Sequence, residues 1–356
     1  MKTFAEYLLF LQKKVGMKNN EVTIKDIAKK SKTSISTVSR ALSNDYHNVS
    51  DETRKKILRI AQKMGYKRNE LAANLRRRKT NTVGIIVPEM ITPFYMDFII
   101  YAQELLNKEG MRVILAQSHE DPKIEKENLK MMEDYRVDGI LISVCHNQKN
   151  VSICKNLIEK GISLVFFDRI IKEISVPKVV VNNYMKSFFM VEHLIRSGKK
   201  NIVHLAGPSY IQYSSERKKA YRDALEKYKI SLTPDYVIET GVEYKDGENS
   251  METIIQKKIP FDAVFCFTEM VALGAKSRLH KHRYMIPDDV VICSISGTTL
   301  STMVHPPITT VEVPIEQMAE SSVQLLLEKL DNPSIENKTT ELDAKLVLRG
   351  STGDNI

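Results

Sequence analysis

A short segment near the N-terminus places one arginine among hydroxyl side chains at helical spacing. If residues 34–42 form a helix, Val38 and Leu42 lie one turn apart and face a hydrophobic core. The other faces then carry Ile35, Ser36, Ser39 and Arg40. A guanidinium group can donate two parallel hydrogen bonds to guanine, and serine or threonine can bond bases or phosphates. This segment therefore has the chemistry of a helix that reads duplex DNA.

Neighbouring helices would hold this segment in place. Thr23 can cap a first helix, because Asp26 follows at its third position as in a capping box. Three polar residues then form a turn, and Ser34 caps the second helix. A third helix begins after Ser50 and ends at Gly65. Two helices joined by so short a turn predict a helix-turn-helix, whose second helix enters the major groove.

The charge of the chain is unevenly distributed. The formal net charge is +9. From residue 18 to residue 80, 17 Lys and Arg residues oppose 6 Asp and Glu residues, which gives +11. Residues 1–17 add +2, so the remaining residues carry −4. A basic end on a slightly acidic body is the pattern of a protein that binds a polyanion with one end.

These N-terminal residues resemble the DNA-binding headpiece of the LacI/GalR family of bacterial repressors. The matching runs are residues 23–28 (TIKDIA), 36–42 (STVSRAL), 49–54 (VSDETR) and 65–66 (GY). The resemblance implies that residues 21–68 form the headpiece, and that a homodimer places two headpieces on a near-palindromic operator in double-stranded DNA. The DNA-binding residues that it implies are Thr23, Ile24, Ser34, Ile35, Ser36, Thr37, Ser39, Arg40, Asn48 and Tyr66.

Residues 69–80 match the hinge that follows the headpiece in this family. The resemblance implies a short helix that orders on DNA and pushes a leucine into the minor groove, with Asn69, Ala72 and Leu75 as its DNA-binding residues. Arg68 departs from the family pattern, which has proline at this position. The alternative is a charged linker without fixed structure, because so short a helix is marginal by itself.

The rest of the chain alternates between apolar strands and helices. Strand segments such as 83–87 and 202–205 are almost continuously apolar, which indicates parallel sheets covered by helices on both faces. The units are too many for one small sheet, so we expect an α/β fold with two doubly wound parallel-sheet subdomains and a cleft between them. The last segments, a strand at 309–313, a helix at 315–330 and a strand at 342–348, are expected to complete the pair.

Residues 81–356 resemble the effector domain of the same family, which is like a periplasmic sugar-binding protein. Short runs carry this resemblance, including residues 137–140 (VDGI), 167–169 (FDR) and 306–311 (PPITTV). It implies a two-lobed, dimer-forming domain that binds a small-molecule effector, a sugar or sugar derivative, between its lobes. The effector-binding residues that it implies are Phe94, Tyr95, Asp168, Arg217, Phe265, Thr268, Glu269 and Ser296.

Some of these residues have a second interpretation. Phe94 and Tyr95 can pack against a ligand or serve as ordinary core aromatics. Arg217 can hydrogen-bond ligand hydroxyl or carboxylate groups, or it can pair on the surface with Glu216 or Asp223.

Three residues depart from the family pattern in the cleft. Ser296 and Asn182 stand where an aspartate is common, and Glu269 stands where the family mostly has aspartate. The first two departures remove negative charge that would hold sugar hydroxyls, so an unusual or acidic sugar stays among the candidates.

No pattern in the sequence indicates catalysis, a cofactor or a metal site. The chain lacks GxSxG and any P-loop or GxGxxG after a strand, and His280 and His282 are too close for one helix face to present both. Four unpaired cysteines predict free thiols in a reducing cytoplasm. The chain has no run of 18 apolar residues, so we expect no membrane span.

We therefore expect a cytoplasmic, nucleoid-associated transcription repressor controlled by an effector. The alternative is a sugar-binding protein or an enzyme that uses the same fold without a DNA role. Residues 1–20 are assigned no function.

Overall fold

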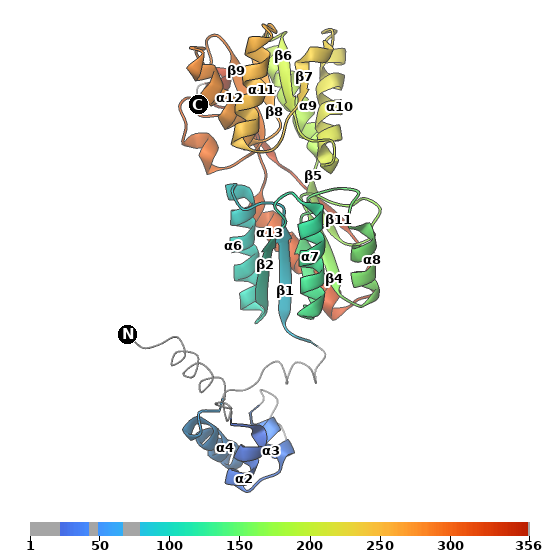
Figure 1. Ribbon diagram of the computed structural model, residues 1–356, viewed down its shortest axis with the longest axis vertical. Helices are drawn as coiled ribbons and strands as arrows, with labels where there is room; N and C mark the ends of the chain where they lie inside the picture. Colours follow the sequence, from blue (N-terminus) through green and yellow to red (C-terminus); the bar gives the residue numbers. More distant parts are fainter. Residues whose placement is uncertain (1–21, 43–48, 67–78, 355–356) are drawn as a thin grey trace, which may run out of the picture. The chain divides into compact units, whose positions relative to one another are not determined.

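A computed structural model describes residues 22–42, 49–66 and 79–354. The chain divides into two units, Met1–Arg78 and Lys79–Ile356 (Figure 1). The N-terminal extension and most of the predicted hinge lie outside the described residues. So do four of the predicted DNA-binding residues, which are Asn48, Asn69, Ala72 and Leu75.

The first unit contains the three helices that the sequence predicts. They are α2 (Ile24–Ser31), α3 (Ile35–Ala41) and α4 (Asp51–Lys63). The capping box is confirmed, because the backbone N–H of Thr23 donates to Asp26 Oδ2 at 2.8 Å and that of Asp26 donates to Thr23 Oγ1 at 3.4 Å. Each helix contributes a fully buried aliphatic side chain to a small core, namely Ile27, Val38 and Ile57, and α3 adds Ala41. This core fixes the faces that the helices turn to solvent.

The second unit contains two six-stranded sheets, one in each lobe. Across its sheet, lobe 1 has β11 (Thr339–Leu342), β5 (Lys178–Val181), β4 (Ser163–Phe167), β3 (Gly139–Ile142), β1 (Thr82–Val87) and β2 (Arg112–Gln117). Lobe 2 has β12 (Lys345–Val347), β10 (Thr309–Glu312), β9 (Val291–Gly297), β8 (Ala263–Cys266), β6 (Ile202–Ala206) and β7 (Val237–Glu239). The strand order is the same in both lobes, which confirms the predicted pair of doubly wound subdomains.

Helices cover both faces of each sheet (Figure 1). Lobe 1 has α6 (Pro93–Lys108) and α13 (Ile315–Asp331) on one face, and α7 (Pro122–Asp134) and α8 (Val151–Glu159) on the other. Lobe 2 has α9 (Asn183–Arg196) and α10 (Gln212–Lys227) on one face, and α11 (Tyr244–Gln256) and α12 (Glu269–Lys281) on the other. Three short 3-10 helices are η1 (Pro234–Tyr236), η2 (Thr299–Thr302) and η3 (Gly350–Thr352).

The side chains of β1 show how one strand serves both layers. Val83, Ile85 and Val87 pack in the cluster that contains α6 and α13, whereas Ile86 packs in the cluster that contains α7 and α8. Successive residues of a strand point to opposite faces, so a strand buried on both sides must be apolar throughout. This is the pattern on which the sequence prediction rested.

The chain passes between the lobes three times, after β5, after β10 and between β11 and β12. The prediction of a single strand at 342–348 is therefore wrong. β11 ends at Leu342 and pairs in parallel with β5, whereas β12 begins at Lys345 and pairs antiparallel with β10. The sequence does not show the break between β11 and β12, because both short edge strands present apolar side chains to a core. A local pattern carries no information on which sheet a strand joins.

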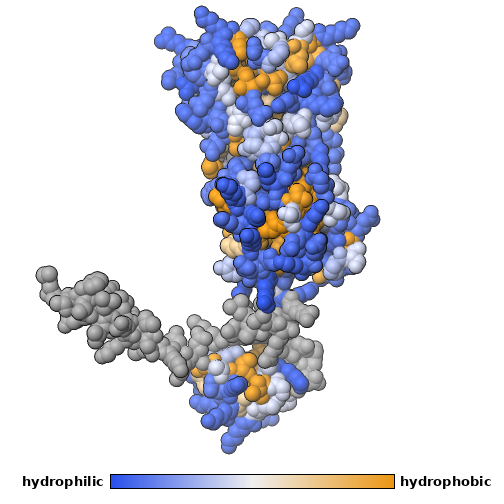
Figure 2. Space-filling model, turned by 45° about the vertical axis from the view of Figure 1, so that its right-hand side comes forward, coloured by the Kyte–Doolittle hydropathy of each residue, from blue (hydrophilic) through white to orange (hydrophobic). Residues whose placement is uncertain are grey.

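The visible surface of the protein is mostly hydrophilic, with small and separate hydrophobic patches (Figure 2). Within the described ranges, no helix combines the length and apolar character that a membrane crossing requires.

A buried histidine in lobe 2 gives the first prediction. His204 of β6 is fully buried, its ring stacks on Phe265 with centroids 4.5 Å apart, and its Nδ1 lies 3.0 Å from the Phe265 carbonyl oxygen. Burial lowers the pKa of His204 from 6.5 to about 3. The unfolded chain therefore binds more protons than the folded chain between these two values. The free energy of unfolding must rise with pH across that window, by up to about 1.4 kcal/mol per pH unit.

We expect His204→Phe to flatten the rise in stability between pH 4 and pH 6.5, measured as urea unfolding at a series of pH values. The exposed His280 offers a matched control, because His280→Phe changes a histidine outside the core. Equal pH dependence in the wild type and the His204 variant would contradict the assignment.

Candidate functional site

One side of α3 carries the residues predicted to read DNA. Val38 and Ala41 are fully buried and face the headpiece core. Ile35 is 46% exposed, and Ser36 and Arg40 are also exposed. The helix therefore has an apolar inner side and a solvent side that carries a cation, a hydroxyl and an aliphatic group. These are the groups that recognise guanine, phosphate or base edges, and the thymine methyl, respectively.

The start of α3 is fixed by hydroxyl groups. Ser34 Oγ accepts the backbone N–H of Thr37 at 3.0 Å and lies 2.7 Å from Ser36 Oγ. The cap leaves a polar N-terminal turn, the end of a recognition helix that approaches base edges. Thr23 is exposed at the start of α2 and Ser39 is half-buried.

Two other predicted DNA-binding residues serve partly as core. Ile24 and Tyr66 are half-buried and pack against the hydrophobic cluster of the headpiece. Their side chains are therefore only in part available to DNA.

In the second unit, two polar residues occupy matching positions at the ends of the central strands. Phe166 and Ser294 are the last residues of β4 and β9 that pair with β3 and β8. Asp168 and Ser296 each follow two residues later, and both have left-handed backbones, with φ of 56° and 62°. Such a conformation costs a non-glycine residue about 1–3 kcal/mol, and it is found preferentially at functional sites. Ligands of open α/β sheets bind outside these carboxyl ends.

Lobe 1 presents a carboxylate that is held by an aromatic side chain. Tyr95 Oη donates to Asp168 Oδ2 at 2.7 Å and lies 3.2 Å from Ser143 Oγ. Phe94 packs edge-on against Tyr95, with ring centroids 5.0 Å apart. Burial raises the pKa of Asp168, while the positive charge of Arg169 and the hydrogen bond from Tyr95 act in the opposite direction. Phe94, Tyr95 and Asp168 thus form one connected group.

Lobe 2 presents an arginine whose orientation is fixed on several sides. Arg217 Nε and Nη2 donate to Asn183 Oδ1 at 3.0 and 2.7 Å, and Nη1 donates to the Phe267 carbonyl oxygen. Nη2 also lies 3.5 Å from Ser296 Oγ. The guanidinium carbon is 4.3 Å from the ring centroid of Tyr213 and 4.8 Å from that of Phe267. A guanidinium held in this way is ready to form further hydrogen bonds without losing rotamer freedom.

The alternative role of Arg217 as a surface ion pair does not match this geometry. Arg217 is only 1% exposed. Glu216 instead pairs with Lys172 at 3.0 Å, and Asp223 pairs with Lys219. Arg217 is therefore an interior residue that lies beside Ser296.

The two lobes also contact each other beside these groups. Arg169 of lobe 1 forms a salt bridge with Glu120 at 2.8 Å, and its Nε donates to the hydroxyl of Tyr213 in lobe 2 at 3.4 Å. The backbone N–H of Asn147 donates across to the Tyr210 carbonyl oxygen at 3.0 Å. Side chains from both lobes thus converge on one region, and any change in the angle between the lobes must change these contacts.

Three predicted effector residues have structural partners of their own. Phe265 is fully buried and stacks on His204. Thr268 caps α12 by accepting the N–H of Val271 at 3.4 Å. Glu269 is 3% exposed, and its carboxylate accepts hydrogen bonds from the turn that follows β9.

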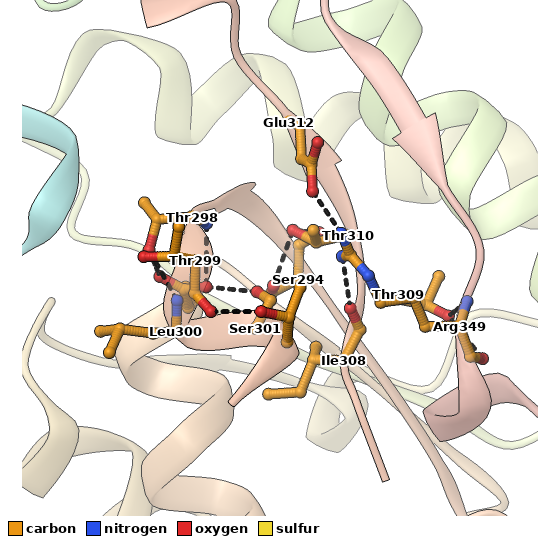
Figure 3. Close-up of polar contacts among 12 residues, drawn as sticks. Ser294, Thr298, Thr299, Leu300, Ser301, Ile308, Thr309, Thr310, Glu312 and Arg349 are labelled. Carbon is orange, nitrogen blue, oxygen red and sulfur yellow. Dashed lines mark hydrogen bonds and ion pairs between the residues drawn. The ribbon is translucent and has the colours of Figure 1, made fainter. Parts of the chain in front are cut away.

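The turn after β9 carries the hydroxyl groups of Thr298 and Ser301, which belong to a network of polar contacts (Figure 3). Glu269 accepts the N–H of Thr298 at 2.9 Å, its Oγ1–H at 2.6 Å and the hydroxyl of Ser301. A Cβ on Gly297 would lie 2.0 Å from Thr310 Cγ2, so this position requires glycine. Glu269 thus acts on the cleft by holding the backbone that carries Ser296.

The sequence did not single out Asn183, Tyr213 or Phe267, which surround Arg217. Phe267 follows Phe265 by two residues and lies just beyond β8, which ends at Cys266. The period of two along a strand was the one available signal. Asn183 and Tyr213 lie at the starts of α9 and α10, and only the tertiary structure brings them together.

Other reactive groups in the described structure do not indicate catalysis. The four cysteines are buried, and burial raises the pKa of the Cys154 thiol to about 12. A thiol with so high a pKa is a poor nucleophile. No group of three or more His, Cys, Asp or Glu residues in the described ranges is arranged to hold a metal ion.

Two family profiles match the chain. One, described as bacterial regulatory proteins of the lacI family, matches residues 23–69, and the other, a periplasmic binding protein-like domain, matches residues 191–352. The chain is also similar to the ribose operon repressor of Haemophilus influenzae, with 28% identity over 331 residues, which are 92% of this chain and 98% of that protein.

Two solved structures resemble the chain over nearly its whole length. A complex of the transcriptional regulator CelR with cellobiose has a TM-score of 0.71 and 25% identity, and covers 93% of this chain and 100% of its own. The lac repressor dimer bound to operator and the anti-inducer ONPF has a TM-score of 0.81 and 20% identity, and covers 94% of this chain and 99% of its own. At 20% identity the second likeness shows the fold alone.

Proposed function

Because the chain belongs to the lacI family of bacterial regulatory proteins, we propose that it is a transcription repressor whose headpiece binds a DNA operator under the control of an effector. The observation that carries this proposal is the geometry of α3. Its buried side, with Val38, anchors the helix in the headpiece, and its exposed side presents Ser36 and Arg40. The +11 charge of residues 18–80 supplies the attraction to phosphates that such a helix needs.

The effector binds between the two lobes, against Tyr95 and Asp168 of lobe 1 and Arg217 and Ser296 of lobe 2, which are paired by hydrogen bonds within each lobe. Carboxylate, hydroxyl and guanidinium groups together suit a ligand with many hydroxyl groups, a sugar or sugar derivative. The names of two similar proteins, a ribose operon repressor and a regulator in complex with cellobiose, support this ligand class. Ligand contacts that differ between two angles of the lobes would shift the equilibrium that controls DNA binding.

The active form is a homodimer that places two headpieces on a near-palindromic operator. Duplex DNA as the ligand places the protein in the cytoplasm, on the nucleoid. The chain requires no cofactor and no metal for this role, and it catalyses no reaction.

Arg40→Ala tests the DNA-reading role. Loss of a bidentate contact to guanine should cost about 1–3 kcal/mol on the specific operator, or about 10- to 100-fold in affinity, and should largely spare binding to random DNA. A gel shift on the DNA upstream of the protein's own gene and its neighbours, with random DNA in parallel, measures both quantities.

The matched control is Arg59→Ala, which removes an exposed arginine from α4 instead of α3. This variant should keep the ratio of specific to random affinity. Equal losses on both DNAs for the Arg40 variant would count against base reading. No retention of the wild type on any of these DNAs at low salt would favour a binding protein or enzyme without a DNA role.

A further inference from the structure

The two lobes place different charges at matching positions of the cleft. In lobe 1 a neutral donor from the first helix meets a carboxylate, since Tyr95 of α6 bonds Asp168 at 2.7 Å. In lobe 2 a cationic donor from the corresponding helix meets a hydroxyl, since Arg217 of α10 lies 3.5 Å from Ser296 Oγ. Asp168 and Ser296 are counterparts by strand register and share the left-handed backbone. Of these two pairs, the one in lobe 1 therefore carries a negative charge and the one in lobe 2 a positive charge.

Among the described residues, all hydrogen-bond acceptors of Arg217 are neutral. They are the side-chain oxygen of Asn183, the carbonyl oxygen of Phe267 and the hydroxyl of Ser296. Arg169 is almost equally buried, and it has a carboxylate partner in Glu120 at 2.8 Å. In the described part of the chain, no carboxylate forms a salt bridge with Arg217.

A buried arginine needs a counter-charge more than a buried lysine does. Lys276, 5% exposed, donates to the Pro306 carbonyl oxygen at 2.6 Å, and burial lowers its pKa to about 8, so it can release its proton. A guanidinium group cannot be neutralised in this way, and burying an unpaired charge is costly.

The nearby Asp168 only partly compensates Arg217. Its negative charge acts on Arg217 through space, but its Oδ2 already accepts a hydrogen bond from Tyr95. Arg217 therefore keeps a positive charge that no salt bridge among the described residues balances.

We propose, on the basis of the effector role given above, that the effector is an anionic polyol, a sugar phosphate or sugar acid, whose anionic group binds Arg217 and Ser296. Its hydroxyl groups donate to Asp168 on the opposite lobe. An anion at Arg217 forms charge-assisted hydrogen bonds, which are about twice as strong as neutral ones and can be bidentate. Such a ligand joins the two lobes through their opposite charges, so it favours one angle between them.

The first test compares ligands that share a carbon skeleton and differ in charge. Suitable pairs are glucose 6-phosphate with glucose, ribose 5-phosphate with ribose, and gluconate with glucitol. Further pairs of the same kind are then tested in the same way. The full-length protein is melted in the presence of each, and hits are titrated calorimetrically and in the operator-binding assay. We expect an anionic member to bind about 10- to 100-fold more tightly than its neutral partner. Inorganic phosphate alone should not change operator affinity.

The results separate this inference from the proposed function. Tighter binding of a neutral member that also alters operator affinity overturns the inference and leaves the effector role in place. If no member of any pair changes the melting temperature or operator affinity, the result contradicts both the anionic effector and the effector role itself. An effect of inorganic phosphate equal to that of the best anionic sugar overturns the role of the polyol.

The second test changes the charge at one residue. Ser296→Asp gives lobe 2 the carboxylate that lobe 1 has, and aspartate tolerates the left-handed backbone there, as Asp168 shows. The introduced carboxylate should pair with Arg217 and remove most of the preference for the anionic ligand. Ser296→Asn is the matched control, because it has the same shape without the charge and should keep the preference. A preference unchanged in Ser296→Asp overturns the proposal.

Discussion

Replacing Ile57 with alanine is expected to destabilise the headpiece by about 2–5 kcal/mol and to abolish operator binding. Ile57 is fully buried in α4 and packs in a small cluster with Ile27, Val38 and Ala41. A domain of this size is stabilised by only a few kcal/mol, so the cost of one cavity can exceed its whole free energy of unfolding. Without α4 in place, α3 loses the surface that orients its exposed side.

The neighbouring residue provides the control for Ile57. Leu58 lies on the same helix but is 40% exposed, so Leu58→Ala removes a similar side chain without a cavity. Circular dichroism melting should show an early headpiece transition for the Ile57 variant only. The second unit forms its own contacts, so ligand-induced stabilisation should persist in both variants. Normal operator affinity in Ile57→Ala would show that operator binding does not depend on the packing of this core.

Replacing Arg217 with alanine is expected to abolish the response to the effector. The change removes hydrogen-bond donors that Asn183, Phe267 and Ser296 hold in one orientation. Each charge-assisted hydrogen bond contributes about 1.5–3 kcal/mol, so ligand affinity should fall at least about tenfold for each bond lost. Titration of the effector into a complex of protein and operator measures this response.

The control for Arg217 is the next residue along α10. Lys218 pairs with Glu239 at 3.6 Å rather than with the cleft residues, so Lys218→Ala should respond to the effector like the wild type. The melting temperature of each variant without ligand checks that lobe 2 is folded. A normal dose response in folded Arg217→Ala would remove this residue from the ligand site.

The three headpiece helices could be predicted from the sequence, because local signals determine them. Thr23, Ser34 and Ser50 cap their helices in the structure, as the sequence indicates. Caps and the 3.6-residue period depend on residues only a few positions apart, so a short stretch of sequence is enough to predict where these helices begin and which side they bury.

The effector unit could be predicted in its layers but not in its last pairing. The apolar strands and their covering helices have strong local patterns. The break at Asp343–Ala344 arises because β11 and β12 join different sheets. β11 pairs with β5, which lies more than 150 positions earlier in the chain. A local stretch of sequence therefore does not show where one strand ends and the next begins.

The cleft shows the same limit at the level of side chains. Arg217 and Asp168 were predicted from resemblance to a family, and the structure places both where the two sheets end. The partners of Arg217 were not predicted, since Asn183 is 34 positions away and Phe267 is 50. Phe265 was predicted for the cleft instead, because the sequence shows an aromatic strand end but not which aromatic side chain meets the arginine.

The crossing between β11 and β12 has a consequence for how the protein is made. Residues 339–347 supply an edge strand to each sheet, one after the other. On the ribosome, the headpiece emerges first and can fold early, whereas β5 and β10 keep open edges until these last strands have been synthesised. Open edges invite pairing with other nascent chains. Premature termination just before residue 339 would therefore damage both lobes at once, although it removes only a few per cent of the chain.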